Sequence, residues 1–261
     1  MNERIFILDV PFDKKTKQEA LNVILSWLKE NKKCHIATPN PEFLLEAQKN
    51  QRFKKILNET DLNIPDGIGI LWAATYLQNP KLLKGIKLLI SLLFHQKSCK
   101  KILKERVSGA DLMLDICEKV ANTPHKIFLL GACEGIAKKA SENLLKQFPA
   151  LKIVGTYAGN PNEKNLVEKI NSSKANIIFV AYGAPKQEIW IHENLPKLTN
   201  VKLAMGVGGA FDFIAKSKKR APKFMRNIGL EWLFRLIQEP KRIKRIWNAV
   251  IKFPYTVTKK R

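Results

Sequence analysis

The chain has 261 residues, of which 45% are hydrophobic and 26% charged, a composition typical of a globular protein with a sizeable core. Its formal net charge of +23 indicates an anionic partner, such as nucleic acid, an acidic membrane surface or a phosphorylated substrate. The start of the chain lacks a signal-peptide pattern, and no apolar run approaches the ~20 residues that span a bilayer. We therefore expect a cytoplasmic protein that can still touch a membrane surface.

Strand-like apolar runs alternate with segments of helical apolar periodicity along residues 1–215. The predicted strands are residues 5–10, 34–37, a short run that ends at Asp66, and residues 126–130, 151–157, 176–182 and 202–206. The predicted helices are residues 13–28 with a cap at Asp13, a helix from Glu42, residues 51–57, 69–77 and 108–121, a helix from the glycine turn 131–135 to residue 148, residues 165–173, and a helix from Lys186. This alternation predicts an α/β fold with a doubly wound, mainly parallel sheet.

One acidic residue lies between a proline and a glycine, in Pro65-Asp66-Gly67. Pro65 fixes its own φ angle, and Gly67 and Gly69 allow a tight turn and close backbone approach. We interpret this stretch as a buried strand that ends in a turn. Asp66 then lies at the carboxyl end of the strand, where ligands bind in open α/β sheets. A turn with a solvated carboxylate is the alternative interpretation.

Other polar side chains also lie at predicted strand ends and helix starts. Thr38 and Asn40 follow the second strand, Gln187 follows the apolar strand at the sheet centre, and Asp212 follows the last strand. The carboxyl ends of parallel strands meet at one edge, so these side chains are expected to converge there. Thr38 and Asn40 can instead cap the next helix. Arg106 precedes another helix start, where it either holds a phosphate with free N–H groups or lies on the surface.

The cysteines and histidines do not form a metal-binding pattern. The cysteines lie far apart without a CxxC pair, so we interpret them as buried free thiols in a reducing compartment. They are Cys34, Cys99, Cys117 and Cys133. The four histidines are equally scattered, and each is expected to be structural rather than catalytic.

Two segments concentrate positive charge beside apolar residues. Residues 79–104 carry seven lysines and no acid around the apolar run 88–94, as expected for a helix at a membrane interface or for an amphipathic helix packed on the body. Residues 216–261 carry 15 Lys and Arg against 2 Glu, interleaved with Trp, Phe and Leu. This composition predicts an interfacial amphipathic appendage. A helical hairpin packed on the body and a nucleic-acid surface are the alternatives.

Several motifs in sequence order resemble the WecG/TagA/CpsF family of bacterial glycosyltransferases, family 26 of the carbohydrate-enzyme classification. Together they span nearly the whole chain: TPNPEF at 38–43, PDGIG at 65–69, ERVSGADL at 105–112, GAPKQE at 183–188, GVGGAFD at 206–212, KRAP at 219–222 and LEWLFRLIQEPKR at 230–242. The resemblance implies a Rossmann-like catalytic core over residues 1–215. It also implies that the basic, aromatic, helical C-terminal appendage, residues 216–261, folds over the active site and contacts the membrane.

The resemblance implies that N-acetylmannosamine moves from its UDP derivative to a polyprenyl-diphosphate-linked N-acetylglucosamine, with inversion and without a metal ion. The product would serve a wall or surface polymer, such as a teichoic acid linkage unit, a capsule or a common antigen. Asp66 matches the position of the proposed general base. The arginines that match diphosphate-stabilising positions are Arg106, Arg235, Arg242 and Arg245. The residues implied to bind substrate are Thr38, Asn40, Gln187 and Asp212.

The partners implied by the resemblance are the UDP-sugar, the lipid-linked acceptor and the anionic inner face of the cell membrane, with no cofactor. Another UDP-hexose, such as glucose or a uronic acid, is an alternative donor. A basic nucleic-acid-binding module is a distant alternative because no recognised nucleic-acid motif is present. Residues 79–104 exceed the usual family spacing, and we interpret them as an extra membrane contact or an altered wall on the acceptor side. The sequence leaves the oligomeric state open, and a homo-oligomer is compatible with it.

Overall fold

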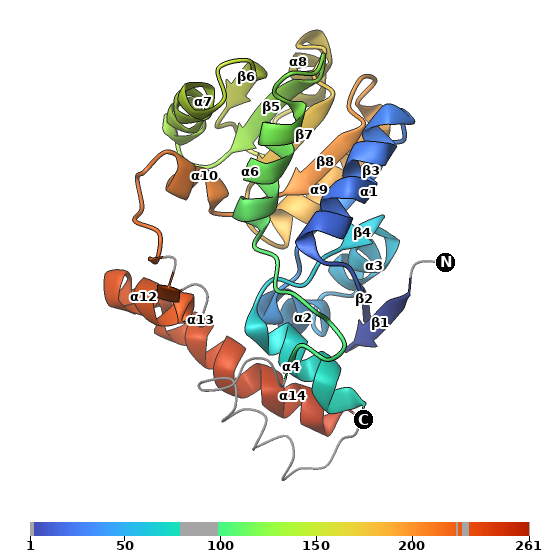
Figure 1. Ribbon diagram of the computed structural model, residues 1–261, viewed down its shortest axis with the longest axis vertical. Coiled ribbons are helices and arrows are strands. Elements are labelled where there is room, and N and C mark those ends of the chain that lie inside the picture. Colours follow the sequence, from blue (N-terminus) through green and yellow to red (C-terminus); the bar gives the residue numbers. More distant parts are fainter. Residues whose placement is uncertain (1–2, 79–98, 223, 226–229, 261) are drawn as a thin grey trace.

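A six-stranded sheet forms the centre of the protein (Figure 1). The computed structural model describes residues 3–78, 99–222, 224–225 and 230–260. In spatial order the strands are β4 (Leu62–Asn63), β3 (Cys34–Ala37), β8 (Leu203–Gly206), β7 (Ile177–Ala181), β5 (Lys126–Gly131) and β6 (Lys152–Tyr157). All neighbouring pairs run parallel, which confirms the predicted Rossmann-like α/β fold.

Helices cover both faces of this sheet because successive strand residues point to opposite sides. One face carries α1 (Lys17–Lys29), α6 (Gly109–Val120), α7 (Ile136–Gln147) and α10 (Ala210–Ile214), and the other carries α8 (Leu166–Ser172), α9 (Lys186–Asn194) and the 3₁₀ turn Leu195–Lys197. Strand β5 shows the alternation: Ile127 and Leu129 pack on the first face, Phe128 and Leu130 on the second. Both faces are thus closed by apolar packing, and polar loops gather at the edge of the sheet.

A second apolar cluster lies beside the sheet, toward the lower part of Figure 1. It joins α2 (Pro41–Ala47), α3 (Gln51–Glu59), α4 (Ile68–Leu77) and the hairpin of β1 (Arg4–Ile7) and β2 (Val10–Asp13). Within it the rings of Trp72 and Tyr76 stack with centroids 5.2 Å apart. Phe253 and Val257, near the end of the chain, are fully buried in the same cluster. The last helix is therefore an integral part of this cluster.

The N-terminal prediction was wrong in two respects. Residues 5–10 do not form one strand, because Leu8 and Asp9 turn the chain with φ angles of 50° and 62° and pair β1 with β2. Thr16, rather than Asp13, caps α1, and it forms a reciprocal capping box with Glu19. Asp13 is instead fully buried, where it pairs with Arg4 at 3.0 Å.

The appendage consists of short helical segments that run across the lower part of the molecule in Figure 1. In the described residues these are α12 (Glu231–Gln238), the 3₁₀ turn Pro240–Arg242, α13 (Ile243–Trp247), the π-helical turn Asn248–Lys252 and α14 (Phe253–Lys259). The segment packs on α2 and α4 of the core, as in the packed-hairpin alternative. It also keeps several large apolar side chains exposed, as expected for the predicted interfacial appendage.

Two further predictions have mixed outcomes. The basic helix predicted over residues 79–104 lies outside the described residues as far as residue 98. The prediction was wrong for residues 100–104, which form bends and irregular chain, and Cys99 and Leu103 are buried in the second apolar cluster. Cys34, Cys99 and Cys117 are buried free thiols, as predicted, but Cys133 is exposed because it lies in the open turn between β5 and α7. No helix in the described part of the chain has the length and apolar character that a membrane crossing requires.

Candidate active site

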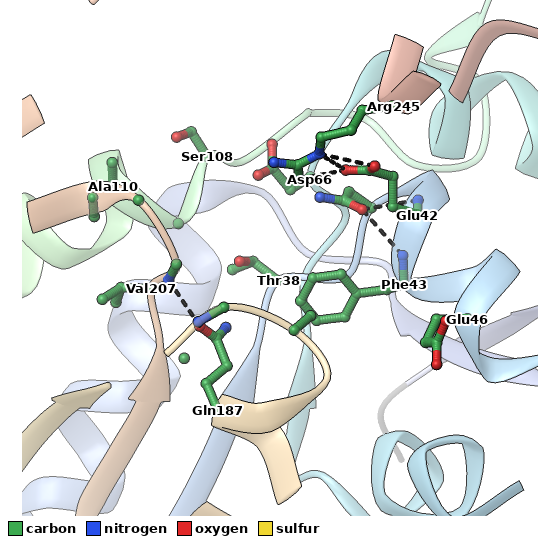
Figure 2. Close-up of a pocket in the computed structure, with 18 of the residues that line it drawn as sticks. Thr38, Glu42, Phe43, Glu46, Asp66, Ser108, Ala110, Gln187, Val207 and Arg245 are labelled. Carbon is green, nitrogen blue, oxygen red and sulfur yellow. Dashed lines mark hydrogen bonds and ion pairs between the residues drawn. The ribbon is translucent and has the colours of Figure 1, made fainter. Parts of the chain in front are cut away.

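A polar cavity of about 490 Å³ lies at the carboxyl edge of the sheet, where the core meets the appendage (Figure 2). Loops that follow β3, β4, β7 and β8 form one wall, and the appendage forms another. Eight of the nine residues predicted for the site line this polar cavity: Thr38, Asn40, Asp66, Gln187, Asp212, Arg235, Arg242 and Arg245. The ninth, Arg106, lines an adjoining groove. The fold therefore gathers side chains that are widely spaced in the sequence.

Asp66 is held at the edge of the polar cavity by the turn between β4 and α4. Its N–H donates to the Pro39 carbonyl at 3.0 Å, which ties this turn to the loop that follows β3. Gly67 has a φ of 107°, a conformation that a side chain would disfavour, and this lets α4 begin directly after the acid. The predicted tight turn thus places the carboxyl group between the core and the appendage.

The surroundings of Asp66 change its acidity. Burial raises the pKa of Asp66 from an ordinary 3.8 to about 6. Arg106 lowers this pKa, the Glu231 carboxylate raises it, and Arg235 lowers it further. Loss of water is the largest of these effects, so the carboxylate is a stronger base than a solvated aspartate. Such a group suits proton abstraction near neutral pH.

A buried glutamate joins the two arginines that lower the pKa of Asp66. Glu231, at the start of α12, is only 7% exposed. It forms an ion pair with Arg235 one turn further along the helix, and the Arg106 Nη1 lies 3.6 Å from its Oε2. The Arg235 guanidinium also lies over the Phe213 ring at 4.8 Å from the centroid. Glu231 therefore connects an arginine of the core with one of the appendage beside Asp66.

Carboxylates also hold the other two appendage arginines of the polar cavity. The Arg245 Nε lies 2.9 and 3.0 Å from the two carboxylate oxygens of Glu42, and Figure 2 shows this pair next to Asp66. Arg242 pairs with Glu239, which also contacts Lys218 at 2.8 Å. Both cations hold the pKa of Glu239 near 2, with Lys218 contributing most. The arginines are thus positioned before any anionic ligand binds.

The floor of the polar cavity is built around Gln187. Its Oε1 accepts the N–H groups of Gly183 and Gly208, each at 3.0 Å, and so joins the loops after β7 and β8. Its Nε2 donates to Glu188 at 2.9 Å, and the other oxygen of Glu188 lies 2.6 Å from the His35 Nε2. His35 is therefore part of a buried structural network. The Gln187 carbonyl oxygen serves the protein itself, although the prediction assigned this side chain to substrate.

Thr38 and Asn40 border the same floor. Asn40 caps α2, because its Oδ1 accepts the N–H groups of Glu42 and Phe43 at 2.9 and 3.2 Å. This is the capping alternative that the sequence left open. Thr38 is 7% exposed and lies against the start of α6, where a Cβ added at Gly109 would be 2.8 Å from the threonine hydroxyl.

An apolar groove of about 510 Å³ continues from the polar cavity between α4 and the appendage. The two spaces share a border that includes Asp66, Arg235, Arg242 and Arg245. Beyond it the apolar groove is lined by side chains from both sides of the molecule: Ile68, Trp72, Leu230, Trp232, Ile246, Val250, Ile251 and Pro254. Arg106 lines this groove next to the shared border. Asp66 therefore stands between a polar and an apolar binding space.

Among the residues that the structure describes, no three His, Cys, Asp or Glu side chains come together as metal ligands. The cations that surround Asp66 and line the two spaces are arginines and lysines of the chain itself.

Comparison with known proteins identifies the family. The model of the family described as "Glycosyl transferase WecG/TagA/CpsF family" matches residues 5–101 and 90–261. The chain belongs to this family. It is 30% identical over 234 residues to a protein of Bacillus spizizenii strain W23, covering 89% of this chain and 80% of that protein. It is 30% identical over 262 residues to proteins of Staphylococcus aureus strains MW2 and MRSA252, covering 98% of this chain and 92% of each relative. All three relatives are named N-acetylglucosaminyldiphosphoundecaprenol N-acetyl-beta-D-mannosaminyltransferase.

Three residues of this glycosyltransferase site were not predicted from the sequence. Glu42 and Glu231 position arginines, and Glu188 fixes Gln187. All three lie inside the motifs that carried the family resemblance, so the motifs mark them. Their roles depend on partners elsewhere in the chain, however, and the motifs alone do not reveal those partners.

Proposed function

We propose that this glycosyltransferase moves N-acetylmannosamine from UDP-N-acetylmannosamine to N-acetylglucosamine carried on a polyprenyl diphosphate. The family assignment and the printed names of the relatives support this reaction. The single observation that carries it is the position of Asp66, a base of raised pKa at the border between a polar, arginine-lined cavity and an apolar groove. Such a border suits a reaction between a water-soluble nucleotide sugar and a lipid-linked acceptor.

In the proposed mechanism Asp66 acts as the general base. It takes the proton of an acceptor hydroxyl while that oxygen attacks the anomeric carbon of the donor sugar. The bond from this carbon to the UDP oxygen breaks, UDP leaves with the bonding electron pair, and a single displacement inverts the anomeric centre. The raised pKa of Asp66 brings its basicity closer to the value that proton transfer at neutral pH requires.

The arginines of the appendage would stabilise the departing diphosphate. Negative charge grows on UDP as the bond breaks, and positioned guanidinium groups can bind phosphate oxygens in pairs. Arg235, Arg242 and Arg245 line the polar cavity from the appendage side and are already oriented by carboxylates. We propose that these fixed cations make a metal ion unnecessary.

We also propose that the appendage docks on the anionic inner face of the cell membrane, where a lipid-linked acceptor is available. Ile243, Trp247, Ile251 and Tyr255 repeat every four residues and are each between 48% and 63% exposed; we call this set the apolar stripe. Lysines and arginines surround it, and the chain carries a net charge of +23. Binding to vesicles with anionic lipid should weaken as salt rises, and binding that is absent or insensitive to salt would contradict this docking.

The proposed reaction is tested by measuring UDP release from UDP-N-acetylmannosamine in EDTA, with and without a short-chain lipid-diphosphate N-acetylglucosamine. Release that depends on the acceptor and persists in EDTA would support the donor, the acceptor and the lack of a metal requirement. A panel of UDP-glucose and UDP-uronic acids in the same assay tests the alternative donors. UDP binding without release from any of these donors would overturn the proposed substrates but leave the family assignment intact.

A further inference from the structure

The apolar groove has a chemistry that the nucleotide sugar does not use. Its walls include Ile68 and Trp72 of α4, and Trp232 and Val250 of the appendage. A sugar or a nucleotide gains little from such walls, because its polar groups would lose water without replacement hydrogen bonds. A hydrocarbon chain gains free energy in proportion to the apolar area that it buries there. The occupant of the apolar groove is therefore expected to be a hydrocarbon.

The apolar groove is continuous with the apolar stripe on the surface. Ile251 belongs to the apolar stripe and also lines the apolar groove, and its neighbour Val250 lines the apolar groove while remaining 42% exposed. A hydrocarbon chain that leaves a membrane at the apolar stripe can thus enter the apolar groove past Ile251 and Val250, which are apolar and partly exposed. This continuity favours a lipid over a detached apolar metabolite.

A positive charge in the apolar groove indicates which chemical group the hydrocarbon is attached to. Arg106 lines the apolar groove but not the polar cavity, and it lies close enough to Asp66 to lower the pKa of that group. The apolar groove therefore combines apolar side chains with a guanidinium that lies close to the proposed base. A polyprenyl-diphosphate sugar combines the matching groups: a hydrocarbon chain, a diphosphate next to it, and the hydroxyl that loses its proton.

We propose that the apolar groove binds the first isoprene units of the acceptor and that Arg106 binds the acceptor diphosphate, an inference that rests on the proposed function. This assignment divides the arginines between the two diphosphates of the reaction. Arg106 serves the acceptor, whereas Arg242 and Arg245, which reach the polar cavity, serve UDP. The family resemblance, in contrast, placed Arg106 together with Arg235, Arg242 and Arg245 in the stabilisation of one diphosphate.

The test is a direct binding experiment on the full chain with farnesyl diphosphate, kept below its micelle concentration. Trp72 and Trp232 line the apolar groove, so their fluorescence reports occupancy. Ile251→Ser is expected to weaken binding by about tenfold, the order expected for losing an apolar contact that the bound hydrocarbon would cover. Ile243→Ser is the matched control: it removes the same side chain from the apolar stripe at a residue outside the apolar groove, and it should leave binding unchanged.

Arg106→Gln separates the two diphosphates. It should weaken the binding of farnesyl diphosphate by about tenfold, as expected for the loss of one charged hydrogen-bonding group. The Kd for UDP, measured by calorimetry, should remain unchanged. Unchanged UDP binding also shows that the variant is folded. The inference is overturned if wild-type protein does not bind farnesyl diphosphate or if both isoleucine variants weaken this binding equally. It is also overturned if Arg106→Gln weakens the binding of UDP instead of farnesyl diphosphate.

Turnover distinguishes this inference from the proposed function. With detergent-solubilised acceptors, Ile251→Ser should raise KM for a long-chain acceptor more than for a two-isoprene acceptor, without changing KM for the UDP-sugar. Turnover that ignores chain length would remove the apolar groove from acceptor binding while leaving the proposed reaction intact. No turnover with any acceptor would reject the proposed reaction, and the farnesyl diphosphate experiment would still decide the occupant of the apolar groove.

Discussion

Replacement of Asp66 by asparagine is expected to stabilise the folded protein at neutral pH and to abolish sugar transfer. The carboxylate is needed as the base in the proposed reaction, but its charge is disfavoured where it lies. Asparagine has nearly the same shape and carries no charge, so it removes both the base and the unfavourable burial of that charge. The substitution thus separates the catalytic value of Asp66 from its cost to stability.

The size of this effect follows from the pKa of Asp66. Folding raises that pKa from 3.8 to about 6. The difference is about two pH units, each worth about 1.4 kcal/mol, so the upper limit is roughly 3 kcal/mol. Because the Asp66 side chain is only partly buried and faces the polar cavity, we expect about 1–2 kcal/mol. The nearby arginines are already included, since they contribute to the same pKa.

The sign of the pH dependence is determined by the proton bound in the folded state. Below pH 3.8 the carboxyl is protonated in both the folded and the unfolded state, so folding does not bury a charge at Asp66. Between pH 3.8 and about 6 only the folded protein retains the proton, so the free energy of unfolding falls as pH rises. Above about pH 6 the carboxylate is charged in both states, and the full free-energy cost of burying its charge is present. The gain in free energy of unfolding from Asp66→Asn should therefore grow between pH 3.8 and about 6 and then remain constant.

The assay is urea unfolding of wild-type and variant protein at several pH values between 4 and 8. Glu134→Gln, which neutralises an exposed carboxylate in the turn before α7, serves as the control and should leave the free energy of unfolding unchanged. If Asp66→Asn is no more stable than wild type at pH 7.5, or if its advantage is independent of pH, the argument from burial is refuted. A fully active Asp66→Asn enzyme would remove Asp66 from the mechanism.

Three further perturbations test other parts of the site. Glu231→Gln removes a carboxylate that raises the pKa of Asp66, so the acid limb of the pH–rate profile should move to lower pH; a limb that stays in place contradicts this coupling. Gly206→Ala places a Cβ 2.2 Å from the Glu188 Oε1 and should cost about 1–3 kcal/mol in urea unfolding, whereas an unchanged unfolding midpoint would mean that the floor adjusts freely. Truncation after residue 215 removes the appendage arginines of the polar cavity and the buried Phe253, so both the transfer rate and the melting temperature should fall. A truncated core that still transfers sugar would show that the appendage is dispensable.

Most of the fold could be predicted because the signals are local. Apolar runs, helical periodicity and glycine turns specify the alternation of strands and helices, and the parallel sheet follows from that alternation. The hairpin of β1 and β2 escaped prediction because Leu8 and Asp9 occupy left-handed positions that usually contain glycine or asparagine. The Thr16 cap was detectable, since Thr16 and Glu19 have the spacing of a capping box.

The site could be predicted only in part, because its pairs join distant segments. The residue list followed from strand ends and from the family motifs, and the fold gathers that list around two adjoining spaces. The pairing of Glu42 with Arg245 spans 203 positions, and nothing near either residue indicates the other. The division of Arg106 from the other arginines likewise depends on which wall each residue occupies, a property of packing rather than of sequence spacing.

The arrangement of the two walls has a consequence for synthesis on the ribosome. Asp66 precedes Arg235, Arg242 and Arg245 in the chain, so the ribosome makes the proposed base long before these arginines. A nascent chain that has not yet reached Arg235 therefore carries the proposed base without the arginines that we propose to stabilise the departing diphosphate.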